Sequence, residues 1–278
     1  MPIAGFGKGA IPERIYKSKG SGTGFIENKG QIRDQFLKPN PSVLFILPLP
    51  GMNVQIRNTG WSYDLLEITA PKSVSGQSHD KDELADPELT RFHRVDVDLA
   101  GCTPFTEISF SEQLMDYQNY YTTGTPMEGA LLVRSFQNIL FKNIYEGIDL
   151  EFLVTPGKNG SFKYNFIVHP EGKIEDIRLR YNGADSQNLE NGKIILETSV
   201  QSINEEIPSS FLFLSDGEKH EVGVRYYQDN SGYYGFETYP PSTFEKNFPS
   251  ASVNLIIDPV PTLNWSTYFG GSGNDVLY

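Results

Sequence analysis

Basic residues, cysteines and long apolar runs are scarce in this sequence of 278 residues. Its 23 Lys and Arg residues are outnumbered by 35 Asp and Glu residues, which gives a formal net charge of −12. Because nucleic-acid binding needs clustered Lys and Arg, this charge argues against a nucleic-acid partner and against an anionic membrane surface. The single cysteine, Cys102, excludes an intrachain disulfide. With no run of about 18 apolar residues, no membrane insertion is expected.

The sequence motifs of common catalytic sites are also missing. There is no GxSxG nucleophile elbow, no phosphate-binding P-loop and no HExxH metal motif. The four histidines are widely separated along the chain, at His79, His93, His169 and His220. These absences favour a non-enzymatic protein with no bound cofactor.

Carboxylates do occur in pairs along predicted strands. Asp96 and Asp98 share the polar face of one alternating segment, about 7 Å apart by strand geometry. Asp149 and Glu151 share a face of another strand, and Asp258 follows the end of a third. Such pairs can hold a cation or act as the acid and base of a glycosidase, although most form the solvated face of a strand. A carbohydrate-active enzyme on a β-sandwich scaffold therefore stays an alternative.

Aromatic and turn-forming residues are abundant. The chain has 15 Tyr and 18 Phe among 26 Gly and 18 Pro, and apolar alternating runs are interrupted by turn residues about every ten positions. This pattern predicts an all-β fold of two packed antiparallel β-sandwich-like subdomains with little helix. We expect a flexible lead over 1–24, a first subdomain over 25–130, a second over 131–260, and the start of a truncated repeat over 261–278.

Two hairpins are the clearest local predictions. The alternating segment 52–57 returns as 61–68 through the turn Asn58-Thr59-Gly60. In the second half, 148–154 returns as 162–168 through a Gly- and Pro-containing turn.

The tyrosine-rich stretch 116–126 is a candidate ligand platform. Tyr117, Tyr120 and Tyr121 stand among Asn and Gln residues, a composition that suits stacking against a sugar ring. Packing between two sheets explains the same residues and is the favoured alternative.

The last nine residues, 270–278, match the nonapeptide pattern of calcium-binding parallel β-rolls. In that pattern Asp275 would be the metal ligand. One copy supplies only half a site, because Ca²⁺ takes about 6–8 oxygen ligands, so a bound calcium ion is not the favoured expectation. A strand and turn that open a repeat cannot bury their own apolar face without further copies.

Several segments together resemble the N-terminal region of bacterial SBBP-repeat proteins, a family of secreted and cell-surface proteins with seven-bladed β-propeller repeats. The resembling segments occur in the family's order, at 25–31, 141–150, 164–170, 177–184, 255–259 and 265–275. One departure is His169-Pro170-Glu171-Gly172, where the family more often has Pro-Gly-Ala-Asp.

The resemblance implies an exported protein at the cell surface or outside the cell, in which this domain precedes a propeller-type array. It also implies relatives in Bacteroidota that carry a C-terminal sorting domain, and it transfers no catalytic residue. We therefore expect a module for adhesion, surface assembly or glycan contact. Its partners would be other domains of the same polypeptide and surface glycans or proteins. A structural cap for the repeat array is a further alternative.

Overall fold

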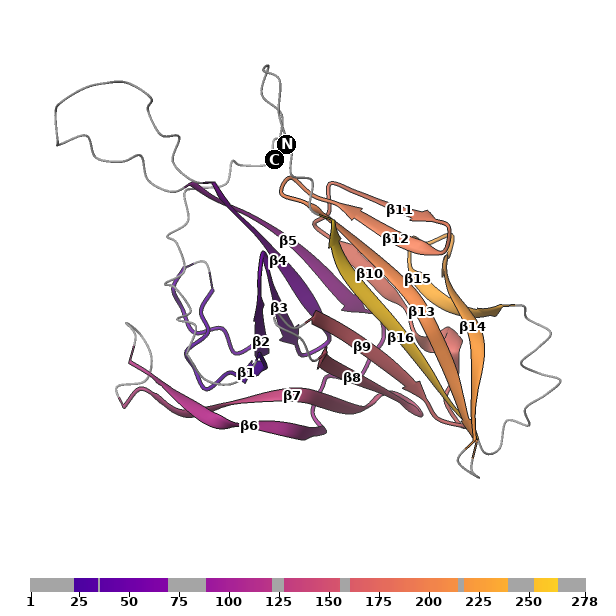
Figure 1. Ribbon diagram of the computed structural model, residues 1–278, viewed down its shortest axis with the longest axis horizontal. Coiled ribbons are helices and arrows are strands. Elements are labelled where there is room, and N and C mark those ends of the chain that lie inside the picture. The colour runs from indigo at the N-terminus through magenta and orange to yellow at the C-terminus, as the bar shows by residue number, and fades with distance from the viewer. Residues whose placement is uncertain are drawn as a thin grey trace, which may run out of the picture.

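The protein is built almost entirely from antiparallel strands in the computed structural model (Figure 1). The structure describes residues 23–34, 36–69, 89–121, 128–155, 161–214, 218–239 and 253–264. Across these ranges all strand pairings are antiparallel, and the one helical element is a short 3-10 turn, η1 (Ile174–Asp176). The prediction of an all-β fold is confirmed.

The strands of the first part of the chain are β1 (Phe25–Glu27), β2 (Val43–Leu49), β3 (Met52–Arg57), β4 (Gly60–Thr69), β5 (Leu89–Leu99) and β6 (Ile108–Tyr120). Those of the second part are β7 (Ala130–Tyr145), β8 (Ile148–Thr155), β9 (Ser161–Val168), β10 (Leu179–Asn182), β11 (Ser186–Glu190), β12 (Lys193–Glu197), β13 (Ser202–Leu214), β14 (Lys219–Gln228), β15 (Tyr234–Tyr239) and β16 (Val253–Asn264).

Strand pairing closes most of these elements into a ring. Hydrogen-bonded neighbours follow the order β13-β14-β15-β10-β5-β4-β3-β2-β1-β7-β8-β9-β16, and β16 pairs in turn with β13. One strand and one strand pair extend from this ring: β6 adds to β7, and the β11–β12 pair adds to β13 through β12. Within the described ranges, only β6 and β11 therefore have a strand partner on a single side.

Strands from the two predicted subdomains pair with each other directly. β1 and β6 both pair with β7, and β5 pairs with β10, so three hydrogen-bonded ladders cross the expected boundary at 130/131. The division into two subdomains stays a prediction. Most of the segment 1–24, predicted to be a flexible lead, and the residues from Trp265 onward lie outside the described ranges.

The hairpin predicted over 52–68 forms as β3 and β4, and its geometry shows why Gly60 is required. In β3 the apolar residues Met52, Val54 and Ile56 are buried while the alternating polar residues are not. A Cβ at Gly60 would lie 2.0 Å from the Val97 carbonyl oxygen of the neighbouring β5, too close for any side chain. The second predicted hairpin forms as β8 and β9.

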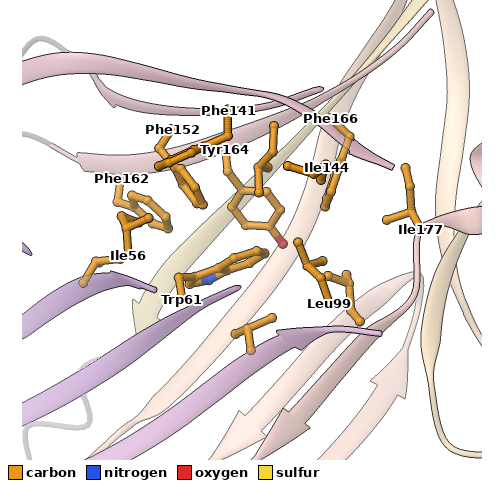
Figure 2. Close-up of a cluster of buried hydrophobic side chains, with 14 of the residues drawn as sticks. Ile56, Trp61, Leu99, Phe141, Ile144, Phe152, Phe162, Tyr164, Phe166 and Ile177 are labelled. Atoms are coloured by element: carbon orange, nitrogen blue, oxygen red, sulfur yellow. The ribbon is translucent and has the colours of Figure 1, made fainter. Parts of the chain in front are cut away.

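Most of the largest fully buried side chains are aromatic. Trp61, from β4, packs against Tyr164 and Phe152, with ring centroids 4.5 and 5.5 Å away (Figure 2). Phe152 also stacks on Phe162, and all four rings are fully buried. Each buried ring of this size contributes about 1.5–3 kcal/mol through the area it removes from water, so this cluster is a major source of stability.

Candidate binding surface

In the part of the chain that the structure describes, most of the exposed large apolar side chains lie on or beside the β6–β7 pair. β6 is the outermost strand along the lower rim in Figure 1, and within the described ranges β7 is its one strand partner. Of the ten exposed large hydrophobic residues in the described ranges, six lie on or immediately beside these two strands. Five of them form what we call the arm surface: Met115, Tyr117, Tyr121, Leu131 and Leu132. The sixth, Phe110, stacks on Phe136 at the rim of the core.

A β-bulge explains why two consecutive leucines are exposed. Between Gln118 and Tyr120 the β6–β7 register shifts, so that Leu131 and Leu132 together stand opposite Asn119. Leu132 adopts the left-handed backbone conformation, with φ of 53°. A non-glycine residue there costs roughly 1–2 kcal/mol, so the surrounding structure must hold it in place.

Polar contacts on both sides hold the bulge. The Asn119 side-chain oxygen accepts a hydrogen bond from the Leu132 amide at 2.8 Å. The Lys29 ammonium donates to the Leu132 carbonyl at 2.9 Å, and the Glu27 carboxylate accepts from the Arg134 amide at 2.8 Å. Lys29 and Glu27 also form an ion pair of 3.0 Å. The segment 25–31 therefore braces the strained part of β7.

The three candidate tyrosines differ in environment. Tyr121 is 72% exposed and Tyr117 is 52% exposed. Tyr120 is half-buried, and burial raises its pKa above the usual tyrosine value. Gly129, with φ of 82°, lies so close to the Tyr121 ring that a Cβ would come within 2.8 Å of it, which leaves that ring resting on bare backbone. Tyr117 and Tyr121 are therefore the two rings presented to solvent.

The carboxylate pair on β5 is engaged by arginines. The Arg57 guanidinium donates to Asp98 at 2.7 Å, and Arg94 donates to Asp96 at 2.8 Å. Burial works against ionisation of Asp96, but hydrogen bonds from Ser62 and Arg94 outweigh it and lower its pKa. These two aspartates are parts of an ion-pair network on the sheet face.

The other paired carboxylates have separate partners. Asp149 faces His169 at 3.0 Å, while Glu151 accepts hydrogen bonds from the side chains of Asn138 and Asn165 at 2.8 and 2.9 Å. Asp258 lies within β16, not after a strand end as predicted, and its carboxylate pairs with Lys163 at 3.0 Å.

Sequence reasoning missed the most deeply buried charged group, Glu205 of β13. Its side chain is fully buried, and its carboxylate accepts hydrogen bonds from tyrosine hydroxyls of four other strands. These tyrosines are Tyr63 of β4, Tyr164 of β9, Tyr181 of β10 and Tyr226 of β14. The available signal was the position of Glu205 two residues after buried Ile203, on the inward face of the strand.

The surroundings of Glu205 indicate a structural role. Burial raises its pKa, and the four tyrosine hydrogen bonds oppose that rise. The same burial raises the pKa of each tyrosine well above its usual value. Since the carboxylate has no solvent-exposed surface, it ties strands together and cannot meet a substrate from solvent.

Metal-binding expectations fall largely outside the described ranges. Asp275, the candidate calcium ligand, lies beyond residue 264, where those ranges end. Among the described residues, no group of three or more His, Cys, Asp or Glu side chains is placed to hold a metal ion. In the same ranges, no helix is long and apolar enough to span a membrane.

The fold and this surface together define an all-β protein with a closed ring of strands and an apolar arm. A family model described as a domain of unknown function, DUF7948, matches residues 25–260, and the chain belongs to that family. Neither the curated proteins nor the solved structures contain a significant match.

Proposed function

We propose that this chain is a non-enzymatic binding module that contacts another polypeptide through the arm surface, in adhesion or surface assembly. The observation that carries the proposal is the exposed, strained Leu132 beside Leu131. A leucine occupies a backbone position that glycine would occupy without strain, and its side chain contributes little to the core. Retaining strain to expose an apolar side chain is typical of a contact surface.

The chemistry of the arm surface favours a protein partner over a sugar. Two leucines and a methionine supply aliphatic area that a polar glycan would leave poorly matched, whereas apolar groups of a protein partner would cover it. The resemblance to SBBP-repeat proteins supports placing this module at the cell surface or outside the cell, within a larger repeat protein.

Glycan contact is a second candidate, and the exposed rings of Tyr117 and Tyr121 favour it. Aromatic faces are the usual stacking partners of sugar rings. A glycan array probed with the intact chain tests this candidate. Binding that is lost on Tyr117→Ala or Tyr121→Ala but kept on Leu132→Gly would support the glycan function instead of the protein one.

Leu132→Gly provides the test of the protein-binding proposal. Glycine adopts the left-handed conformation freely. The free energy of unfolding of the variant should therefore equal or slightly exceed that of the parent, to within about 1 kcal/mol. Peptides that bind the parent chain can be selected from a random display library. We expect these peptides to bind Leu132→Gly at least about tenfold more weakly than they bind the parent.

The matched control is Phe92→Ser, which removes an exposed apolar side chain from β5, away from the arm. Selected peptides should bind it as tightly as the parent. Unchanged binding to Leu132→Gly, or an equal loss on Phe92→Ser, would show that the arm surface is not the contact site.

A further inference from the structure

In the described ranges two strands, β11 and β6, have a free main-chain edge, and these two edges differ greatly in length. β11 spans five residues, whereas β6 spans thirteen. An unpaired edge presents a row of amide and carbonyl groups that another strand can join, so natural proteins usually shorten or protect such edges. The long β6 edge is the exception in a fold that pairs its other long strands on both sides.

β6, ISFSEQLMDYQNY, is only partly protected as an edge: its register with β7 shifts between Gln113 and Tyr117, and Glu112 has a left-handed φ of 54°, irregularities that interrupt strand addition locally. It contains no proline and no lysine, the residues that commonly block strand addition. Most of its side chains are exposed, including Met115 at 93% and Tyr117. Apolar and polar side chains therefore both flank an accessible main chain.

The charges on β6 indicate the chemistry of a partner strand. Its two charged side chains, Glu112 and Asp116, are both acidic and exposed. Within the described part of the chain, neither carboxylate has a cationic nitrogen within 4.0 Å. Two carboxylates without a counter-charge favour a partner that brings Lys or Arg.

The same charges disfavour a second copy of this chain. If two β6 strands paired antiparallel in full overlap, with Ile108 opposite Tyr120, Glu112 of each copy would stand opposite Asp116 of the other. Like charges directly opposite each other destabilise a strand pair. A basic partner strand meets no such repulsion.

We propose that β6 accepts an extended, basic segment of another polypeptide as an added strand. Main-chain hydrogen bonds along the β6 edge would hold the segment, and its Lys or Arg side chains would pair with Glu112 and Asp116. This inference rests on the proposed function, because it specifies the class of partner that would bind beside the same arm surface.

The test uses the intact chain and a synthetic peptide of about ten residues that alternates Lys with Val or Thr. A charge-matched control peptide has the same sequence with alternate backbone amides N-methylated, which removes main-chain donors and keeps every positive charge. Calorimetric titration should show binding of the first peptide and at least about tenfold weaker binding of the second.

Two variants locate the contact. The double variant Glu112→Gln/Asp116→Asn should weaken binding of the unmethylated peptide several-fold, about three- to tenfold, and reduce its dependence on salt. Glu190→Gln, the matched control on the other edge strand β11, should leave binding unchanged.

Equal binding of the two peptides, no binding of either, or equal losses on the β6 and β11 variants would each overturn strand addition. A parent chain that dimerises in sedimentation, and whose dimer dissociates on addition of the peptide, would identify a second copy as the occupant and also overturn it. If display-selected peptides lose binding on Leu132→Gly while N-methylation has no effect, the proposed function stands and this inference alone fails.

Discussion

Glu205 accepts hydrogen bonds from tyrosines of four other strands, so a change at this one carboxylate alters the fit of five strands at once. Buried polar groups of this kind are costly when they lose their partners and stabilising when all are satisfied. Here the donors come from strands that are distant in sequence, so all four hydrogen bonds can form only when the ring of strands is assembled.

Removing the Glu205 carboxylate should therefore lower the free energy of unfolding substantially. We expect Glu205→Ala to lower the free energy of unfolding by about 3–5 kcal/mol, since it leaves a cavity and several unpaired hydroxyls. Glu205→Gln keeps the shape and one acceptor oxygen and should lose less, about 1–2 kcal/mol. Urea denaturation followed by circular dichroism measures both. Equal losses for the two variants would show that the hydrogen bonds contribute little beyond packing.

His169 provides a second residue-scale prediction, on pH. Partial burial disfavours its charged form, but hydrogen bonds to Asp149 and Asn254, with Glu171 nearby, raise the pKa of His169 above its usual 6.5. A folded-state pKa that is raised stabilises the protein fully below the unfolded value, and this stabilisation is lost as pH rises through the folded value. The urea concentration at the unfolding midpoint should therefore decrease as the pH is raised from about 6 to 8. This decrease should be smaller in His169→Gln. An identical decline in that variant would rule out His169 as its source.

At the scale of elements, hairpins with local signals formed where the sequence predicted them. The 52–68 pair has strict alternation and a turn ending in Gly60, and both are properties of adjacent residues. The bulge at Leu131–Leu132 has no such signal. Its conformation depends on Lys29, about a hundred residues away, and on Asn119 across the strand pair. An alternating pattern would have exposed only one of the two leucines.

At the scale of the whole molecule, the pairing of β13 with β16 completes a ring that includes strands from both halves. One core cluster contains side chains from both halves as well, among them Trp61 and Tyr164. Neither half retains all its strand partners without the other.

We therefore expect the two halves to unfold together. Urea unfolding of residues 25–260 followed by near-ultraviolet and far-ultraviolet circular dichroism should give coincident transitions. A chain limited to residues 25–130 should lack fixed tertiary structure, because β1 and β5 would lose the partners β7 and β10. Two separated transitions would instead establish the predicted subdomains as independent folding units.

The amino-acid sequence by itself determined the all-β class, the two hairpins and the acidic character of the surface. Period-two alternation, turn residues and net charge are local or additive properties, so they can be read without knowing the partners of each strand. Only the tertiary structure decided that Asp96 and Asp98 pair with arginines, that Glu205 is enclosed by four tyrosines and that β6 remains a free edge. Each of these depends on contacts between distant residues, and strand order is not encoded in any single segment.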